Sequence, residues 1–190
     1  MKRFLVAAVG FHVLAIAGVA ATGTDSPFGI SMGMPRADVL PLIGDYREVT
    51  PGMLRTDRVP NGQAELESYA VIVSDTHGVC KIMAVGKDLP LEAAVGGLRN
   101  AFDAAATRLD EQFGRRETYE YTRPRFMSHA NVEPREPQTV LAASCSPSGR
   151  EIAHVLLEAV ASNSRFGYLR FHYESPSYSA CRRELTQTAR

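Results

Sequence analysis

Four polar side chains in the last third of the chain are spaced so that they could act together: His154, Glu158, Arg170 and His172. They lie on two segments that predict a hairpin turning at Asn163 to Arg165, with all four on its outer face. In one register Glu158 faces Arg170 and His154 faces Glu174. A pairing shifted by one step on both sides instead sets His154 opposite His172, and imidazoles are common metal ligands.

The first register predicts a solvated sheet face with one cross-strand ion pair, which is the interpretation we favour. The second supports an alternative function, a small hydrolase or metal-binding enzyme that uses His154 and His172 with Glu158 as base. The sequence has no Gly-rich phosphate loop, no C-x-x-C and no H-E-x-x-H. Ser144 to Ser148 offers hydroxyls and Cys145 a thiol, but no histidine can be assigned beside them. We therefore expect no enzyme, no catalytic residue, no metal and no cofactor.

These side chains depend on the strands predicted over Glu151 to Ala161 and Phe166 to Glu174. The second alternates clearly, with Leu169, Phe171 and Tyr173 directed inward. The first also suits a helix, because Ser148 and Glu151 form a capping-box pattern. We favour a strand there, since the short turn leads directly into the alternating segment.

The rest of the chain predicts further helices and strands. Helices are expected over Pro35 to Gly44, with a kink or early end near Pro41, and over Leu91 to Phe113, with Ser179 beginning one more turn. Strands are expected over Phe28 to Met32, Tyr46 to Thr50, Glu67 to Val73, Val79 to Gly86 and Thr139 to Ser144.

This order predicts an α+β fold in which a helix followed by antiparallel strands occurs twice, over residues 28–89 and 90–175. Neither unit can bury both faces of what it builds, so we expect them to pack as one body with the helices on one face of the sheet. Residues 22–190 would then form a single α+β domain. Apolar residues make up 45% of the chain, which argues against disorder.

The segment from Arg115 to Pro137 combines arginines, aromatics and prolines, and from Thr122 it predicts a long irregular loop. Loops of this length often carry function. The candidate binding residues within it are Tyr119, Tyr121, Arg123, Arg125 and Phe126. The alternative is a solvated connection without a binding role.

The N-terminus predicts a secretory signal peptide over residues 1–21. Lys2 and Arg3 precede an apolar run from Phe4 to Ala21 that closes on small residues. The competing interpretation is a permanent membrane anchor, but His12 and two glycines interrupt the run, so we expect no stable anchor after cleavage. The chain has 21 basic and 21 acidic residues, and loss of Lys2 and Arg3 leaves 19 basic residues. We therefore expect a periplasmic or secreted protein that does not bind nucleic acid.

Three cysteines fit an exported protein with one disulfide. Cys80 alternates with Ile82 and Ala84 on one face, where a small buried side chain would lie. Cys145 and Cys181 lie in more polar surroundings, so they are the predicted disulfide. Three reduced thiols and an intermolecular bridge are the alternatives.

The run from Gly33 to Gly44, GMPRADVLPLIG, resembles a helix signature of small exported proteins of the SmpA/OmlA type and of β-lactamase inhibitor protein. The resemblance implies helices laid on an antiparallel sheet and a role in binding other envelope proteins. Pro41 departs from the signature, and the lipid-accepting cysteine of SmpA/OmlA is absent. The chain, with Gly78 to Lys87, also resembles uncharacterised exported bacterial proteins.

We therefore expect a non-enzymatic protein-binding module of the bacterial envelope. Its partner would be another envelope or secreted protein, bound through the sheet face and the Arg115 to Pro137 loop. An inhibitor, an immunity factor and an assembly accessory all fit this expectation. A small-molecule-binding module is a third class, which ligand-dependent thermal stabilisation would reveal.

Overall fold

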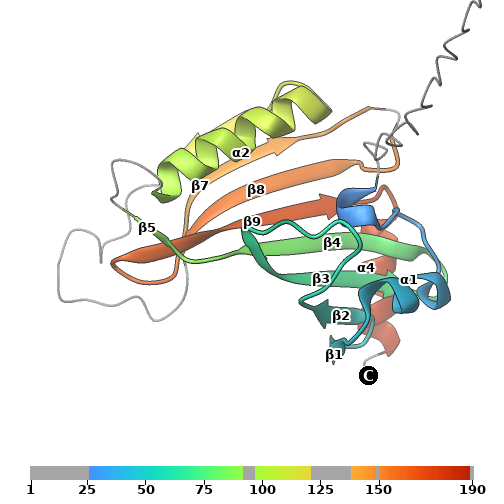
Figure 1. Cartoon of the computed structure of the whole chain (residues 1–190). Coiled ribbons are helices and arrows are strands. Elements are labelled where there is room, and N and C mark those ends of the chain that lie inside the picture. Colours follow the sequence, from blue (N-terminus) through green and yellow to red (C-terminus); the bar gives the residue numbers. More distant parts are fainter. Residues whose placement is uncertain (1–25, 92–96, 121–137, 149, 189–190) are drawn as a thin grey trace, which may run out of the picture.

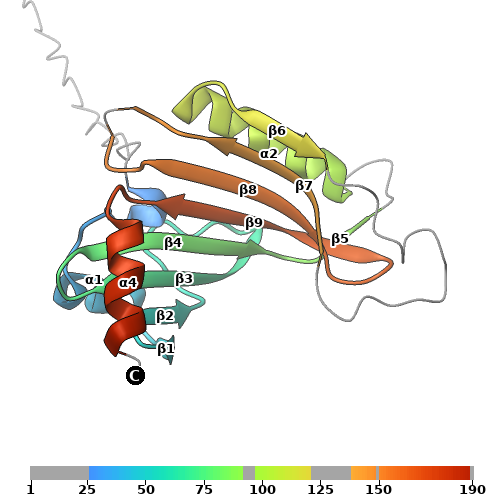
Figure 2. The same ribbon diagram turned by 180° about the vertical axis from the view of Figure 1, so that it is seen from behind.

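One continuous antiparallel sheet organises the protein. The computed structural model describes residues 26–91, 97–120, 138–148 and 150–188. Within these residues nine strands form a sheet in the order β1-β2-β3-β4-β9-β8-β7-β6, with β5 beside β9 (Figures 1 and 2). Three α-helices accompany it, so the α+β class is confirmed.

The elements have the following bounds. The helices are α1 (Arg36–Ile43), α2 (Leu98–Phe113) and α4 (Tyr178–Thr188), preceded by a 3-10 turn, η1 (Pro27–Gly29). The strands are β1 (Arg47–Thr50), β2 (Met53–Thr56), β3 (Leu66–Ser74), β4 (Gly78–Gly86), β5 (Leu89–Pro90), β6 (Glu117–Glu120), β7 (Gln138–Cys145), β8 (His154–Ala161) and β9 (Phe166–Glu174).

The larger core lies on the sheet face that α1 and α2 cover, which we call the inner face (Figure 1). Phe102 of α2 is 1% exposed and packs in the same cluster as Leu157 and Phe171 from the strands below it. The apolar residues of α2 recur at three- and four-residue steps, so one side of the helix is buried while Arg99 and Asp103 remain exposed. Val39 and Ile43 anchor α1 in the same cluster.

The outer face carries α4, which packs against β3 and β4 (Figure 2). A smaller apolar cluster joins Cys181 of α4 to Ile72 of β3 and Cys80 of β4. The expectation that the helices cover one face is therefore not met. The segment from Ser179 shows a weak pattern, and only its contact with the sheet explains why it continues for three turns as a helix.

The disulfide joins Cys80 to Cys181, so the predicted pair of Cys145 and Cys181 is wrong. The reason is a bulge. Ile72 pairs with Lys81 and Val73 pairs with Val79, so Cys80 is an extra residue in β4. The bulge breaks the alternation that placed Cys80 with Ile82 and Ala84, and it turns Cys80 toward α4. Cys145 stays buried as a free thiol on the inner face.

Several expected boundaries also change. Residues 28–32 do not form a strand, because Phe28 has a φ of 57° and belongs to η1. The helix expected from Leu91 begins at Leu98, since Leu89–Pro90 pairs with β9. The Pro/Gly-rich connection after Thr50 contains β2, which sequence reasoning missed. Pro41 does not end α1, whose last residue is Ile43.

Candidate functional site

A polar cluster lies on the outer face where β7, β8 and β9 run side by side. Its centre is the carboxylate of Glu158, whose side chain is 13% exposed. His172 Nε2 donates to Glu158 Oε2 at 2.9 Å, and Arg170 Nε donates to the same oxygen at 2.8 Å. Arg170 Nη2 also lies 2.8 Å from this oxygen, as part of the ion pair. Thr139 Oγ1 donates to the other oxygen, Oε1, at 2.8 Å. Both carboxylate oxygens are therefore occupied by donors.

The cluster arises from the register of the last hairpin. Glu158 pairs with Arg170 and His154 pairs with Glu174, which is the first of the two registers expected from the sequence. His172 reaches Glu158 from the neighbouring position on the same face. The choice of a strand over a helix for Glu151 to Ala161 is confirmed by β8, which begins later than predicted, at His154.

The electrostatics of Glu158 follow from these contacts. Burial alone raises the pKa of the carboxyl group. Hydrogen bonds from His172, Arg170 and Thr139, together with the Arg170 charge, outweigh burial and lower the pKa from its usual 4.5 to about 2. A carboxylate with so low a pKa is a weak base. The cluster is thus suited to holding Arg170 and His172 in fixed positions rather than to taking protons from a substrate.

His154 does not join the cluster. It lies opposite Glu174, and its Nδ1 is 3.5 Å from Ser146 Oγ. The second register, which would set His154 opposite His172, is not the one observed, so the pair of imidazole ligands that the alternative function required is not assembled. No group of three or more His, Cys, Asp or Glu side chains among the described residues could hold a metal ion.

The thiol of Cys145 is also poorly placed for nucleophilic chemistry. It is 8% exposed on the inner face, and burial, followed by the charge of Asp110, raises its pKa. A nucleophilic thiol needs the opposite shift, toward the thiolate.

His172 has an unusual environment for a sheet surface. The residue is 8% exposed, and Nδ1 is the one buried side-chain nitrogen or oxygen without a hydrogen-bond partner in the described part of the chain. A carboxylate can only accept, so Nε2 is the donor to Glu158, and Nδ1 on the other side of the ring has no protein partner among the described residues. Sequence reasoning placed His172 on an exposed face and did not anticipate this burial.

No family model, curated protein or solved structure matches this chain. The interpretation of the site therefore depends on its geometry. No helix within the described ranges is both long and apolar enough to cross a membrane.

One of the five candidate binding residues extends the polar cluster toward the sheet edge. Tyr119 pairs with Ala142, and Ala142 pairs with Glu158, so these side chains share the outer face. Tyr119 is 47% exposed on β6, which pairs only with β7 among the described strands. The other four candidates, Tyr121, Arg123, Arg125 and Phe126, lie outside the described residues.

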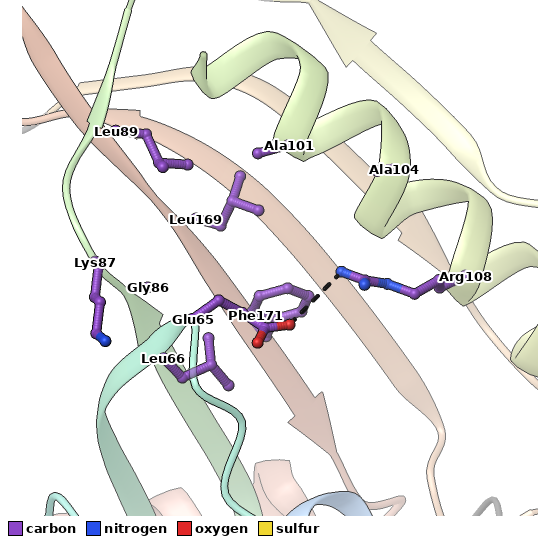
Figure 3. Close-up of a pocket in the computed structure, with 10 residues that line it drawn as sticks. All are labelled: Glu65, Leu66, Gly86, Lys87, Leu89, Ala101, Ala104, Arg108, Leu169 and Phe171. Carbon is purple, nitrogen blue, oxygen red and sulfur yellow. Dashed lines mark ion pairs between the residues drawn. The ribbon is translucent and has the colours of Figure 1, made fainter. Parts of the chain in front are cut away.

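Sequence reasoning did not anticipate a recess beneath α2. It lies between α2 and the β3, β4, β5 and β9 side of the sheet, and its volume is about 290 Å³ (Figure 3). Six apolar residues line it: Leu66, Leu89, Ala101, Ala104, Leu169 and Phe171. The signal in the sequence was the pair of alanines three positions apart, Ala101 and Ala104, on one flank of α2. Their small side chains leave the space unfilled.

Charged side chains surround the mouth of this recess. Arg108 extends from α2 toward Glu65, with Arg108 Nη2 4.0 Å from Glu65 Oε1 (Figure 3). Lys87 follows β4 at the opposite side of Glu65. The recess is therefore apolar inside and charged at its rim.

Proposed function

We propose that the chain is an exported, non-enzymatic protein-binding module of the bacterial envelope, working in the periplasm or after secretion. The apolar run from Phe4 to Ala21 after Lys2 and Arg3 supports export. The disulfide between Cys80 and Cys181 supports an oxidising compartment. Inhibitor, immunity and assembly-accessory roles all fit this proposal.

The observation that carries the proposal is the uneven cover of the sheet. The half formed by β9, β8, β7 and β6 has α2 on its inner face, whereas α4 lies over β3 and β4 on the outer face (Figure 2). No described helix packs on the outer face of β8 and β7. Within the described ranges, this part of the outer face therefore carries no helix, and a partner protein can pack against it.

The side chains on this surface suit a protein partner. Tyr119 offers an exposed aromatic ring, and the Arg170 side chain is 34% exposed beside Glu158. Tyrosine and arginine are the residue types most often central to protein interfaces. Arg170 is also held in place by Glu158, so little side-chain entropy is lost when a partner binds it.

The two halves of the sheet support a related proposal about architecture. α1 precedes β1 to β4, and α2 precedes β6 to β9. The last strand of each half, β4 and β9, meets the other at the centre of the sheet. We infer that residues 28–89 and 90–175 are two units of one plan packed as a single body within one domain, residues 22–190, as the resemblance to β-lactamase inhibitor protein also implies.

Replacing Tyr119 with glutamate is expected to weaken partner binding about tenfold or more, because it places a charge where an aromatic side chain would be buried. The mature chain would be purified from the periplasm of its own host with a C-terminal tag, after mild crosslinking. A single enriched envelope protein is expected with the unsubstituted chain. The affinity of that protein for each variant would then be measured with purified components.

The matched control is Asp103→Lys, which changes charge on the exposed side of α2, far from the outer face. It should retain the partner, whereas Tyr119→Glu and a deletion of residues 122–137 should lose it. A monomer with no enriched protein would contradict the proposal. So would a partner that both Tyr119→Glu and the deletion retain.

A further inference from the structure

We propose that the recess beneath α2 binds a single-chain amphiphile with an anionic head group, of the medium-chain fatty-acid class. This site is on the inner face, whereas the proposed partner surface is on the outer face, so the two proposals are independent. The apolar lining, the volume and the charges at the mouth each specify part of the ligand.

The lining specifies an apolar chain. Leu66, Leu169 and Phe171 are each 8% exposed and form the floor, while Ala101 and Ala104 form the helix wall. A polar ligand would lose its hydrogen bonds to water here without replacement, which costs free energy. An apolar chain has no hydrogen bonds to water to lose, and its binding removes the surrounding apolar side chains from water.

The volume specifies one chain of moderate length. A space of about 290 Å³ equals about ten water-sized groups, since each water occupies about 30 Å³ in the liquid. A methylene group is of similar size, so a chain of about eight to ten carbons would fill the recess. A lipid with two long chains is too large, and so is a folded segment of another protein.

The rim specifies the head group. Arg108 and Lys87 contribute two positive charges and Glu65 one negative charge, so the mouth has a net charge of about +1 at neutral pH. Lys87 forms no ion pair with any described residue. The pair of Arg108 and Glu65 is long, at 4.0 Å, and its side chains are 64% and 57% exposed, so it contributes little stability. A carboxylate at the mouth can therefore replace Glu65 as the partner of Arg108.

Titration calorimetry of the mature chain with decanoate, below its micellar concentration, tests the proposal. Decanoate should bind saturably with one molecule per chain, and 1-decanol should bind about tenfold more weakly because it lacks the charge. Ala104→Leu should weaken both probes about tenfold by filling the recess, and Ala101→Leu serves as a second filling variant. Thr107→Leu is the matched control, because it adds the same apolar group to an exposed position on α2 outside the recess, and it should change neither affinity.

The rim is tested by breaking one ion pair from each side. Arg108→Gln should weaken decanoate binding about tenfold and leave 1-decanol unchanged. Glu65→Gln should strengthen decanoate binding several-fold, because it frees Arg108. If the ion pair only stabilised the fold, Arg108→Gln and Glu65→Gln would change the affinity for decanoate in the same direction. That result would overturn the assignment of the head group. Absence of saturable decanoate binding, or an Ala104→Leu variant that binds as tightly as the unsubstituted chain, would overturn the site itself.

Discussion

Cys181→Ser is expected to lower the free energy of unfolding by about 4 kcal/mol and to release α4 from the sheet. Cys80 and Cys181 are 101 residues apart, so their bond removes a large loop-closure entropy from the unfolded chain. The bond also holds α4 against β3 and β4, because the apolar cluster of Ile72, Cys80 and Cys181 that joins them is small. Urea unfolding followed by circular dichroism, with and without dithiothreitol, would measure both effects.

The free cysteine provides the control for this prediction. Dithiothreitol should destabilise the unsubstituted chain to the level of Cys181→Ser and should leave Cys181→Ser unchanged. Cys145→Ala should retain the full response to the reductant, because Cys145 has no disulfide partner. If Cys145→Ala abolished the response instead, Cys145 would belong to the disulfide and the assignment would be wrong.

Protonation of Glu158 is expected to cost about 3 kcal/mol of stability as the pH falls from about 4.5 to about 2. The folded-state pKa of about 2 lies below the usual value of 4.5. The stabilisation is therefore complete above pH 4.5, where the carboxylate is ionised in both the folded and unfolded states. It is lost as the pH falls toward 2, because the unfolded state takes up the proton first.

Glu158→Gln removes the titrating group and keeps the shape of the side chain. The difference in unfolding free energy between the unsubstituted chain and Glu158→Gln should be largest at pH 6 and should approach zero near pH 2. Glu111→Gln, the same substitution at an exposed position on α2, is the matched control and should give only a small difference. A difference that stays constant between pH 6 and pH 2 would show that Arg170, His172 and Thr139 do not keep Glu158 ionised.

The regular elements of this fold could be predicted because their signals are local. The alternation of Leu169, Phe171 and Tyr173 and the turn after Ala161 determine β9 and its register with β8. That register placed Glu158 opposite Arg170 correctly. The repeat of Leu98, Phe102, Ala105 and Leu109 predicted α2 in the same way, although its start was placed too early.

The features that sequence reasoning missed depend on contacts between distant segments. The bulge in β4 turns the side chain of Cys80 to the outer face of the sheet, and no local pattern in the sequence distinguishes a bulge from a regular strand. The burial of His172 depends on neighbours from other strands. The recess depends on what Ala101 and Ala104 fail to fill, which is visible only once α2 lies over Phe171.

The position of β9 beside β4 also controls when the molecule can become complete. β4 ends at Gly86, but its neighbour β9 begins at Phe166. The centre of the sheet therefore cannot form until almost the whole chain has been synthesised. Pairings between such distant segments carry a large loop-closure cost and slow the folding reaction. A chain that emerges with its N-terminus first can pair β4 with β3, but the other edge of β4 has no partner until β9 appears. The central pairing of β4 with β9 can therefore form only when synthesis of the chain is nearly complete.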